Sequence, residues 1–101
     1  MSNNTEQTEI KEVVSKPPVT YIKAIPLKEY EDLNRIRDEL KLGNILIVKI
    51  TPLAMKNMEQ VKIAIDELKS HVKSINGDIA RLGEERIVIT PPPIKIWRRN
   101  L

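Results

Sequence analysis

The sequence contains no cysteine. Disulfides and thiolate metal sites are therefore excluded, and the composition fits a reducing compartment such as the cytoplasm. Phenylalanine is also absent and aromatic residues make up only 3% of the chain, so any hydrophobic core has to be aliphatic. No apolar run approaches the roughly 18 residues that a membrane span requires. The first residues contain no apolar stretch of the secretory type, so we expect no signal peptide.

Glycine and histidine are scarce as well. Gly43, Gly77 and Gly83 each stand where a helix end or a turn is expected, and no glycine-rich phosphate loop is present. His71 is the only histidine, and without a second imidazole or a thiol a transition-metal site lacks ligands. The phase of the surrounding pattern places His71 at the border of an apolar stripe, which is typical of a structural or surface histidine.

The charges that are present are mixed in sign. Seventeen basic and 14 acidic residues leave a net charge of +3, and their dispersal along the chain indicates a solvated surface. With 101 residues, of which 41% are hydrophobic, the chain is expected to form one domain with a modest core.

Residues 1–18 differ in composition from the rest. They are rich in Ser, Asn, Thr, Glu and Gln, with Ile10, Val13 and Val14 as the only apolar island before two prolines. Such a segment buries too little apolar surface to offset its ordering entropy. We expect a disordered tail over residues 1–18 and one folded domain over residues 19–101.

The longest pattern in the chain is an amphipathic helix. Its apolar residues recur at steps of three and four, namely Met58, Val61, Ile65, Leu68, Val72 and Ile75. Thr51-Pro52 suits the start of this helix, and Asn76-Gly77 suits its end. A second amphipathic helix is expected from Lys28 to Leu42, with acidic residues in its first turns.

The remaining apolar runs predict strands. They cover residues 19–25, 45–50, 78–82, 86–90 and 94–97. The run Ile45–Ile50 is almost continuously apolar, which is typical of a central strand. The resulting order is β-α-β-α-β-β-β. It predicts an α/β two-layer sandwich in which two helices cover one face of a mixed sheet of about five strands.

Nothing in this pattern requires catalysis. Asp66, Asp78, Glu84 and Glu85 are acidic, but no feature makes them converge as acid–base chemistry requires, so we interpret them as solvated charge. No serine has a nucleophile context. We therefore expect no enzymatic activity, no metal and no cofactor.

A sheet with helices on one face leaves its other face uncovered. Because strand side chains alternate between faces, some aliphatic residues have to lie on that open side. A patch of this kind usually marks an interface, and two-fold dimers are the commonest assembly. We expect a homodimer through the open face, with interface residues Ile87, Ile89, Ile94 and Ile96.

Two surface features remain. Ile63 stands on the polar side of the long helix, near Lys56 and Glu59, and is a candidate contact for another protein. The C-terminal Lys95, Trp97, Arg98 and Arg99 are compatible with contact to phosphates, bases or anionic lipid. We favour the simpler interpretation, a solubilising end with Trp97 packed on the sheet edge.

The order of several short motifs resembles one family. These motifs are Pro26–Tyr30, Leu40–Asn44 leading into Ile45–Ile50, Asp66-Glu67-Leu68 leading to Ile75–Leu82, and Ile87–Pro91. Together they resemble the archaeal form of the SepF family of cell-division proteins, over about Tyr21 to Trp97.

This resemblance implies a cytoplasmic, non-enzymatic adaptor at the division site, whose partner is an FtsZ-type protein or another protein of the division machinery. It implies a dimer of small α/β domains that binds the tail of the tubulin-like protein FtsZ and tethers it to the membrane through an N-terminal amphipathic helix. We expect the partner peptide to contact Lys56, Glu59, Lys62 and Ile63 in a groove formed by the helices and the sheet edge.

Two departures from the family pattern matter. Ser70 stands where bacterial members carry a glycine that supports polymerisation, so the resemblance does not imply assembly beyond a dimer. Met1–Gln7 is neither basic nor apolar, so these residues do not match the membrane helix that the resemblance implies.

A second interpretation belongs to another class. Small basic β-α-β-α-β-β domains also include Alba-like chromatin proteins, which bind nucleic acid through phosphate contacts. That function needs Lys and Arg gathered on one face. Here many bases alternate with Glu or Asp along the helices, which disfavours a nucleic-acid partner.

Overall fold

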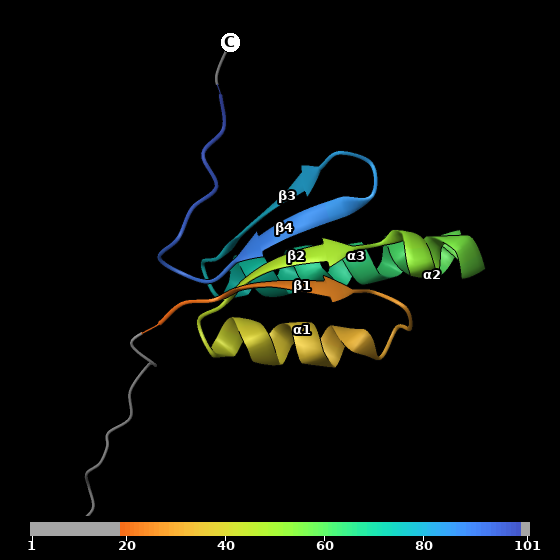
Figure 1. The fold of residues 1–101 in the computed structure, drawn as a ribbon, viewed down its shortest axis with the longest axis horizontal. Coiled ribbons are helices and arrows are strands. Elements are labelled where there is room, and N and C mark those ends of the chain that lie inside the picture. Colours follow the sequence, from red (N-terminus) through yellow and green to blue (C-terminus); the bar gives the residue numbers. More distant parts are fainter. Residues whose placement is uncertain (1–18, 100–101) are drawn as a thin grey trace, which may run out of the picture.

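The computed structural model describes residues 19–99 of the chain. Within this range the elements are β1 (Ile22–Pro26), α1 (Asp32–Lys41), β2 (Ile45–Lys49), α2 (Thr51–Lys56), α3 (Met58–Ser74), β3 (Asp78–Leu82) and β4 (Arg86–Thr90) (Figure 1). The predicted N-terminal tail, residues 1–18, lies outside the described residues, so that prediction stays untested.

The strands form one mixed sheet in the order β1-β2-β4-β3. β1 and β2 are parallel, and the other two neighbouring pairs are antiparallel. The prediction of a central strand over Ile45–Ile50 is confirmed, because β2 has a neighbour on each side. The α/β class with a mixed sheet is also confirmed.

The sheet has four strands rather than the predicted five. Residues 94–97 form no strand. After Pro91 the chain turns away, and the backbone N–H of Ile96 donates to the Asp78 carboxylate at 2.9 Å instead of joining a ladder. Arg98, and not Trp97, contacts the edge strand β3, since its guanidinium donates to Asp78 and to the carbonyl of Ile79. Trp97 itself is 82% exposed, so the prediction that it packs on the sheet edge is wrong.

The helices cover one face of the sheet, as predicted. The strand residues that point to them are Ile25, Leu46, Val48, Ile87 and Ile89, each at most 2% exposed. The helices contribute Leu33, Ile36, Leu40, Val61, Ala64, Leu68 and Val72 to the same core. This core contains no aromatic side chain among its fully buried members, in line with the composition.

The long helix is broken into α2 and α3. Asn57 has an extended backbone (φ −160°, ψ 98°), and its side-chain oxygen accepts the N–H of Gln60 at 3.2 Å. Asparagine competes with the helix by bonding nearby amides, so it ends one helix and caps the next. The expected start at Thr51-Pro52 is found in α2, whose Leu53 is buried and donates its N–H to the Leu27 carbonyl.

α1 begins four residues later than predicted. The carboxylate of Asp32 accepts the N–H groups of Lys28 and Glu29 at 2.8 and 2.9 Å. These residues therefore form a turn that leads into the helix instead of its first turn. β1 likewise starts at Ile22 instead of Val19 and extends to Pro26, a position that an edge strand tolerates because no donor is needed there.

Candidate functional site

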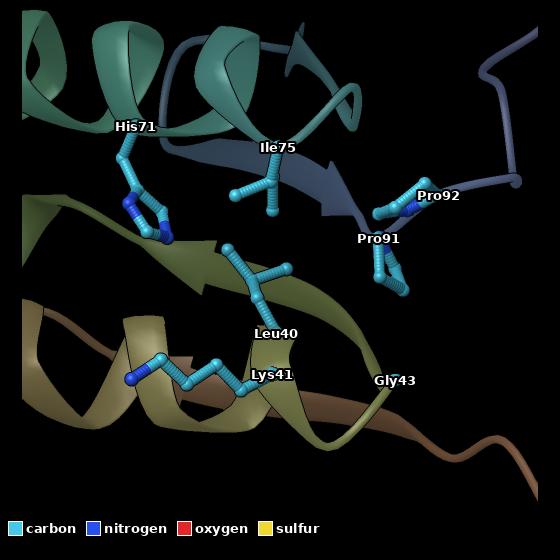
Figure 2. Close-up of a pocket in the computed structure, with 7 residues that line it drawn as sticks. All are labelled: Leu40, Lys41, Gly43, His71, Ile75, Pro91 and Pro92. Atoms are coloured by element: carbon cyan, nitrogen blue, oxygen red, sulfur yellow. The ribbon is translucent and has the colours of Figure 1, made fainter. Parts of the chain in front are cut away.

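An apolar cavity of about 210 Å³ lies where α1 and α3 end. We call it the α1–α3 cavity. Its lining residues are Leu40, Lys41, Gly43, His71, Ile75, Pro91 and Pro92. Figure 2 shows Leu40 and Ile75 facing each other across it, the imidazole of His71 pointing from α3 toward α1, and the two prolines at its outer side.

Local sequence features build the α1 side of this cavity. Gly43 has a φ of +88°, a conformation that glycine adopts without strain, and it ends α1. The side chain of the next residue, Asn44, accepts the N–H of Tyr21 at 3.0 Å and donates to Glu39 at 2.8 Å. Lys23 completes the network by an ion pair with Glu39 at 3.0 Å. The hydrogen bond from Asn44, and then that from Lys23, lowers the pKa of Glu39 below its usual value. The Glu39 carboxylate therefore stays ionised in this network.

The α3 side depends on Gly77. A Cβ at this position would lie 2.3 Å from the Thr90 carbonyl oxygen, so only glycine lets the chain pass this close to the end of β4. This close approach brings Ile75 next to the corner at Pro91. The cavity thus depends on backbone contacts between segments that are distant in sequence.

His71 is the polar group of the cavity. Its Nε2 is buried and has no hydrogen-bond partner among the described residues. Burial lowers the pKa of His71, and the charges of Arg37 and Lys41 lower it further. The imidazole is therefore neutral near pH 7 and offers an unsatisfied nitrogen to a ligand. The predicted position at the border of the stripe is confirmed.

α1 and α3 meet along a seam next to this cavity. Glu67 of α3 accepts hydrogen bonds from the Tyr30 hydroxyl at 2.5 Å and from Arg37 at 3.2 Å. The hydrogen bond to Glu67 is the main cause of the raised pKa of Tyr30, and burial adds to it. Ile63 lies one turn before Glu67 on α3 and His71 one turn after it, so all three border the α1–α3 seam.

The predicted partner-contact residues lie at the other end of the seam. Lys56 ends α2 and forms an ion pair with Glu29. On α3, the Nζ of Lys62 lies 4.0 Å from the Oε2 of Glu59. Ile63 is 50% exposed. None of these residues lines the α1–α3 cavity. Whether they bind a partner stays a prediction.

The uncovered side of the sheet is defined by the strand register. Val88 pairs with Ile47 and Ala80, and Ile47 pairs with Ala24, so these side chains form one row across the sheet. Ile22 and Ile45 form part of the next row. We call this surface of Ile22, Ala24, Ile45, Ile47, Ala80 and Val88 the open face. It is aliphatic, as expected.

Ile87 and Ile89 are not part of the open face. They are 1% and 0% exposed and pair with Val48 and Leu46, beneath the helices. The prediction that they contact a second copy is therefore wrong. Ile94 and Ile96 are half-buried, and the Ile94 carbonyl accepts the hydroxyl of Thr90 at 2.7 Å at the rim of the open face. Their role in a dimer stays a prediction.

The cavity was missed at the sequence level. Each of its lining residues had another explanation there, as helix stripe, helix end or corner. The signal that could have found it is the lone histidine in the last turns of a helix, combined with a proline run expected at the same end of the sheet. Within residues 19–99 no group of His, Asp and Glu could hold a metal ion, and no helix is long and apolar enough to cross a membrane.

Comparison with known proteins gives consistent matches. The sequence model of one family, described as Cell division protein SepF, matches residues 22–96. The Cell division protein SepF of Haloferax volcanii is 35% identical over 71 residues, which are 70% of this chain and 59% of that protein. This chain thus spans about three fifths of the length of that relative.

Solved structures show the same fold. A SepF-like protein from Pyrococcus furiosus is 40% identical, with a TM-score of 0.73 over 82% of this chain and 100% of its own. A SepF-like protein from Archaeoglobus fulgidus is 25% identical, with a TM-score of 0.72 over 80% and 96%. Cell division protein SepF from Methanobrevibacter smithii, solved in complex with FtsZ-CTD, is 20% identical, with a TM-score of 0.69 over 78% and 99%.

Proposed function

The chain belongs to the SepF family of cell-division proteins, and we propose that it is a non-enzymatic, dimeric adaptor for the tail of an FtsZ-type protein. The observation that carries this proposal is the α1–α3 cavity, an apolar site at the end of a seam between two helices, in a fold shared with a SepF that was solved in complex with FtsZ-CTD. The adaptor would act at the division site.

The α1–α3 seam has the dimensions of a peptide site. From Ile63 to Ile75 the distance along α3 is about 18 Å at 1.5 Å per residue. An extended peptide covers this distance with roughly five or six residues. Its one end would contact Ile63 with Lys56, Glu59 and Lys62 nearby, and its other end would enter the cavity. This path joins the predicted contacts to the cavity.

The chemistry of the cavity selects the peptide. A volume of about 210 Å³ with mostly apolar walls suits one or two aliphatic side chains and is too small for a cofactor, since cofactor and drug pockets are roughly 300–1,000 Å³. Lys41 favours an acidic neighbour in the peptide. His71 Nε2 offers a hydrogen bond that is unmade without a ligand.

Peptide titration tests the docking site. A fluorescent peptide with the FtsZ tail sequence from the same organism should bind the full chain with a dissociation constant of about 1–100 μM, as measured by anisotropy. Ile63→Ser should weaken binding about five- to tenfold, because it removes an exposed apolar contact. Lys69→Ser, on an outward position of α3, is the matched control and should bind like the wild type. Absence of binding by the wild type would refute the docking proposal.

The open face supports the dimer. A two-fold axis would place the aliphatic rows of two copies against each other and bury surface that is otherwise exposed to water. Two copies would then present two seams, which lets the dimer bridge two tails. This arrangement is the physical basis of the proposed adaptor role.

Light scattering after size exclusion tests the dimer. The wild type should have twice the mass of the 11.6 kDa chain. Val88→Lys should give a monomer with unchanged helical circular dichroism. A lysine in the middle of the open face is hydrated in the monomer, whereas a second sheet would bury its charge without a partner. A monomeric wild type at concentrations of about 100 μM would rule out the dimer.

The structure does not favour the nucleic-acid alternative. Lys23, Arg37, Lys56 and Arg98 are each held by an acidic side chain at 3.2 Å or less. Their charges are therefore compensated locally instead of forming a basic surface. We expect no salt-dependent gel shift with DNA or RNA.

A further inference from the structure

Trp97 is the only tryptophan of the chain, and its side chain is 82% exposed. The segment that carries it, residues 94–99, is nevertheless held in place. The N–H of Ile96 and the guanidinium of Arg98 both donate to the carboxylate of Asp78. Figure 1 shows this segment, in dark blue, leading past the start of β3 and away from the domain. The fold thus fixes the backbone on both sides of Trp97 and leaves its indole in solvent.

The open face alone is small for a stable dimer. Four strands of five residues, at about 4.8 Å between strands and about 3.3 Å per residue, give a flat area of roughly 300 Å² per copy. Even twice this area, to allow for the relief of the side chains, is below the roughly 800 Å² that each partner of a stable interface buries. The difference has to come from surface next to the sheet.

The 94–99 segment provides such surface. It lies at the rim of the open face, where the Ile94 carbonyl accepts the hydroxyl of Thr90. A tryptophan buries about 150–250 Å² when it is covered. Two copies contribute two tryptophans, so covering both would bring the interface closer to the area that a stable dimer needs.

The charges of the open face favour one orientation of the second copy. By strand alternation Asp78 shares the face of Ala80, and it is the only acidic residue there among the described strands. Lys49 and Arg86 are register partners at the opposite end of the same face. A two-fold axis parallel to the strands would gather the cations of both copies at one end. An axis across the strands instead brings the cationic end of one copy to the Asp78 end of the other, which is electrostatically favourable.

We propose that the 94–99 segment of each copy packs against the second copy, with Trp97 on Leu82 of the partner subunit. This proposal rests on the proposed dimer. Leu82 ends β3 on the open face, in the row of Arg86, and is 49% exposed. With the axis across the strands, the start of β3 in one copy, near which Trp97 stands, lies opposite the end of β3 in the other. The two contacts are equal, as two-fold symmetry requires.

The turn that follows Leu82 carries complementary charge. Glu84 and Glu85 are exposed and form no ion pair within residues 19–99, and the same holds for Arg99. The proposed contact brings Arg99 of one copy toward this acidic turn of the other. Charges at the rim of an interface fix its orientation more than they add to its affinity.

The single tryptophan reports on the contact by fluorescence. In the wild-type dimer, acrylamide should quench Trp97 less, and its emission should lie at shorter wavelength, than in the monomeric variant Val88→Lys. Trp97→Ser should raise the dissociation constant of the dimer about 10- to 100-fold, as measured by light scattering on dilution. Met55→Ser is the matched control, because Met55 is 87% exposed on α2, away from the sheet, and it should leave the constant unchanged.

Introduced cysteines locate the contact, since the chain has none of its own. A disulfide requires Cα atoms within about 7 Å of each other. The double variant Trp97→Cys/Leu82→Cys should therefore form a species of twice the chain mass on non-reducing gels, because within one copy these residues stand at opposite ends of β3. The double variant Trp97→Cys/Ile22→Cys should not, since Ile22 meets the segment only if the axis is parallel to the strands.

The outcomes separate this contact from the dimer itself. A dimeric wild type whose Trp97 is quenched as strongly as in Val88→Lys would overturn the packing of Trp97 and leave the dimer in place. Cross-linking through Ile22 instead of Leu82 would overturn the assigned orientation. A monomeric wild type would overturn both the dimer and the contact. If Trp97 of the dimer is shielded only by vesicles of anionic phospholipid, its partner is a lipid surface and the proposal is overturned.

Discussion

At the scale of single residues, Asp78 organises the C-terminal segment. Its carboxylate accepts hydrogen bonds from the backbone N–H groups of Ile79 and Ile96 and from both terminal nitrogens of the Arg98 guanidinium. The bonds from Arg98, followed by that from Ile96, lower the pKa of Asp78 from 3.8 to about 2. One side chain therefore holds an irregular segment against the edge of β3.

Replacing Asp78 by Asn should destabilise the protein by about 1–2 kcal/mol near pH 7, with allowance for the partly exposed Arg98. Because the pKa of Asp78 is lower in the folded state, its contribution is present above pH 3.8 and is lost as the pH falls toward 2. Urea unfolding of both chains at a series of pH values measures this. A difference that persists unchanged at the acid end would contradict the assignment.

His71 provides a second test at this scale. Its folded-state pKa should lie below the ordinary 6.5, because burial, Arg37 and Lys41 disfavour the imidazolium. Stability should therefore be full above pH 6.5 and decrease as the pH falls below it. Since it is the only histidine, its Cε1 proton can be titrated by NMR without assignment. A pKa above the ordinary value would show that an acidic group, and not burial, dominates.

At the scale of elements, the break between α2 and α3 depends on one asparagine. Asn57→Ala should cost about 1 kcal/mol, because the N–H of Gln60 loses its cap. The matched control is Asn34→Ala on the exposed side of α1, where the effect should stay within about 0.5 kcal/mol. Thermal unfolding of both variants compares them. Equal effects would mean that the capping bond contributes little.

Elements were easier to predict than their faces. The apolar spacing and the Gly and Pro positions were sufficient for four of the five predicted strands and for the region of both helices. The assignment of Ile87 and Ile89 to the open face was wrong. Alternation along a strand separates its side chains into two faces, but it does not show which face the helices cover. The register of β4 with Leu46 and Val48 decides it.

At the scale of the whole molecule, the two-layer arrangement gives consecutive strand residues different burial and therefore different contributions to stability. Leu46 is 0% exposed under the helices, whereas Ile47 points to the open face. Leu46→Ala should cost about 2–5 kcal/mol and Ile47→Ala about 1 kcal/mol or less. Denaturant unfolding at low protein concentration, where copies separate, measures both. Equal losses would mean that the open face is packed within one copy.

The sequence by itself determined the aliphatic core, the first four strands and the regions of the helices, the central position of Ile45–Ile50 and the family, because these follow from composition, local spacing and the order of short motifs. Only the tertiary structure decided which isoleucines face the helices, that residues 94–97 attach to Asp78 instead of pairing, and that Leu40, His71 and Pro91 meet at a cavity. These features depend on contacts between distant segments. Local helix and strand patterns cannot specify such contacts, because the same pattern is compatible with more than one tertiary packing of the elements.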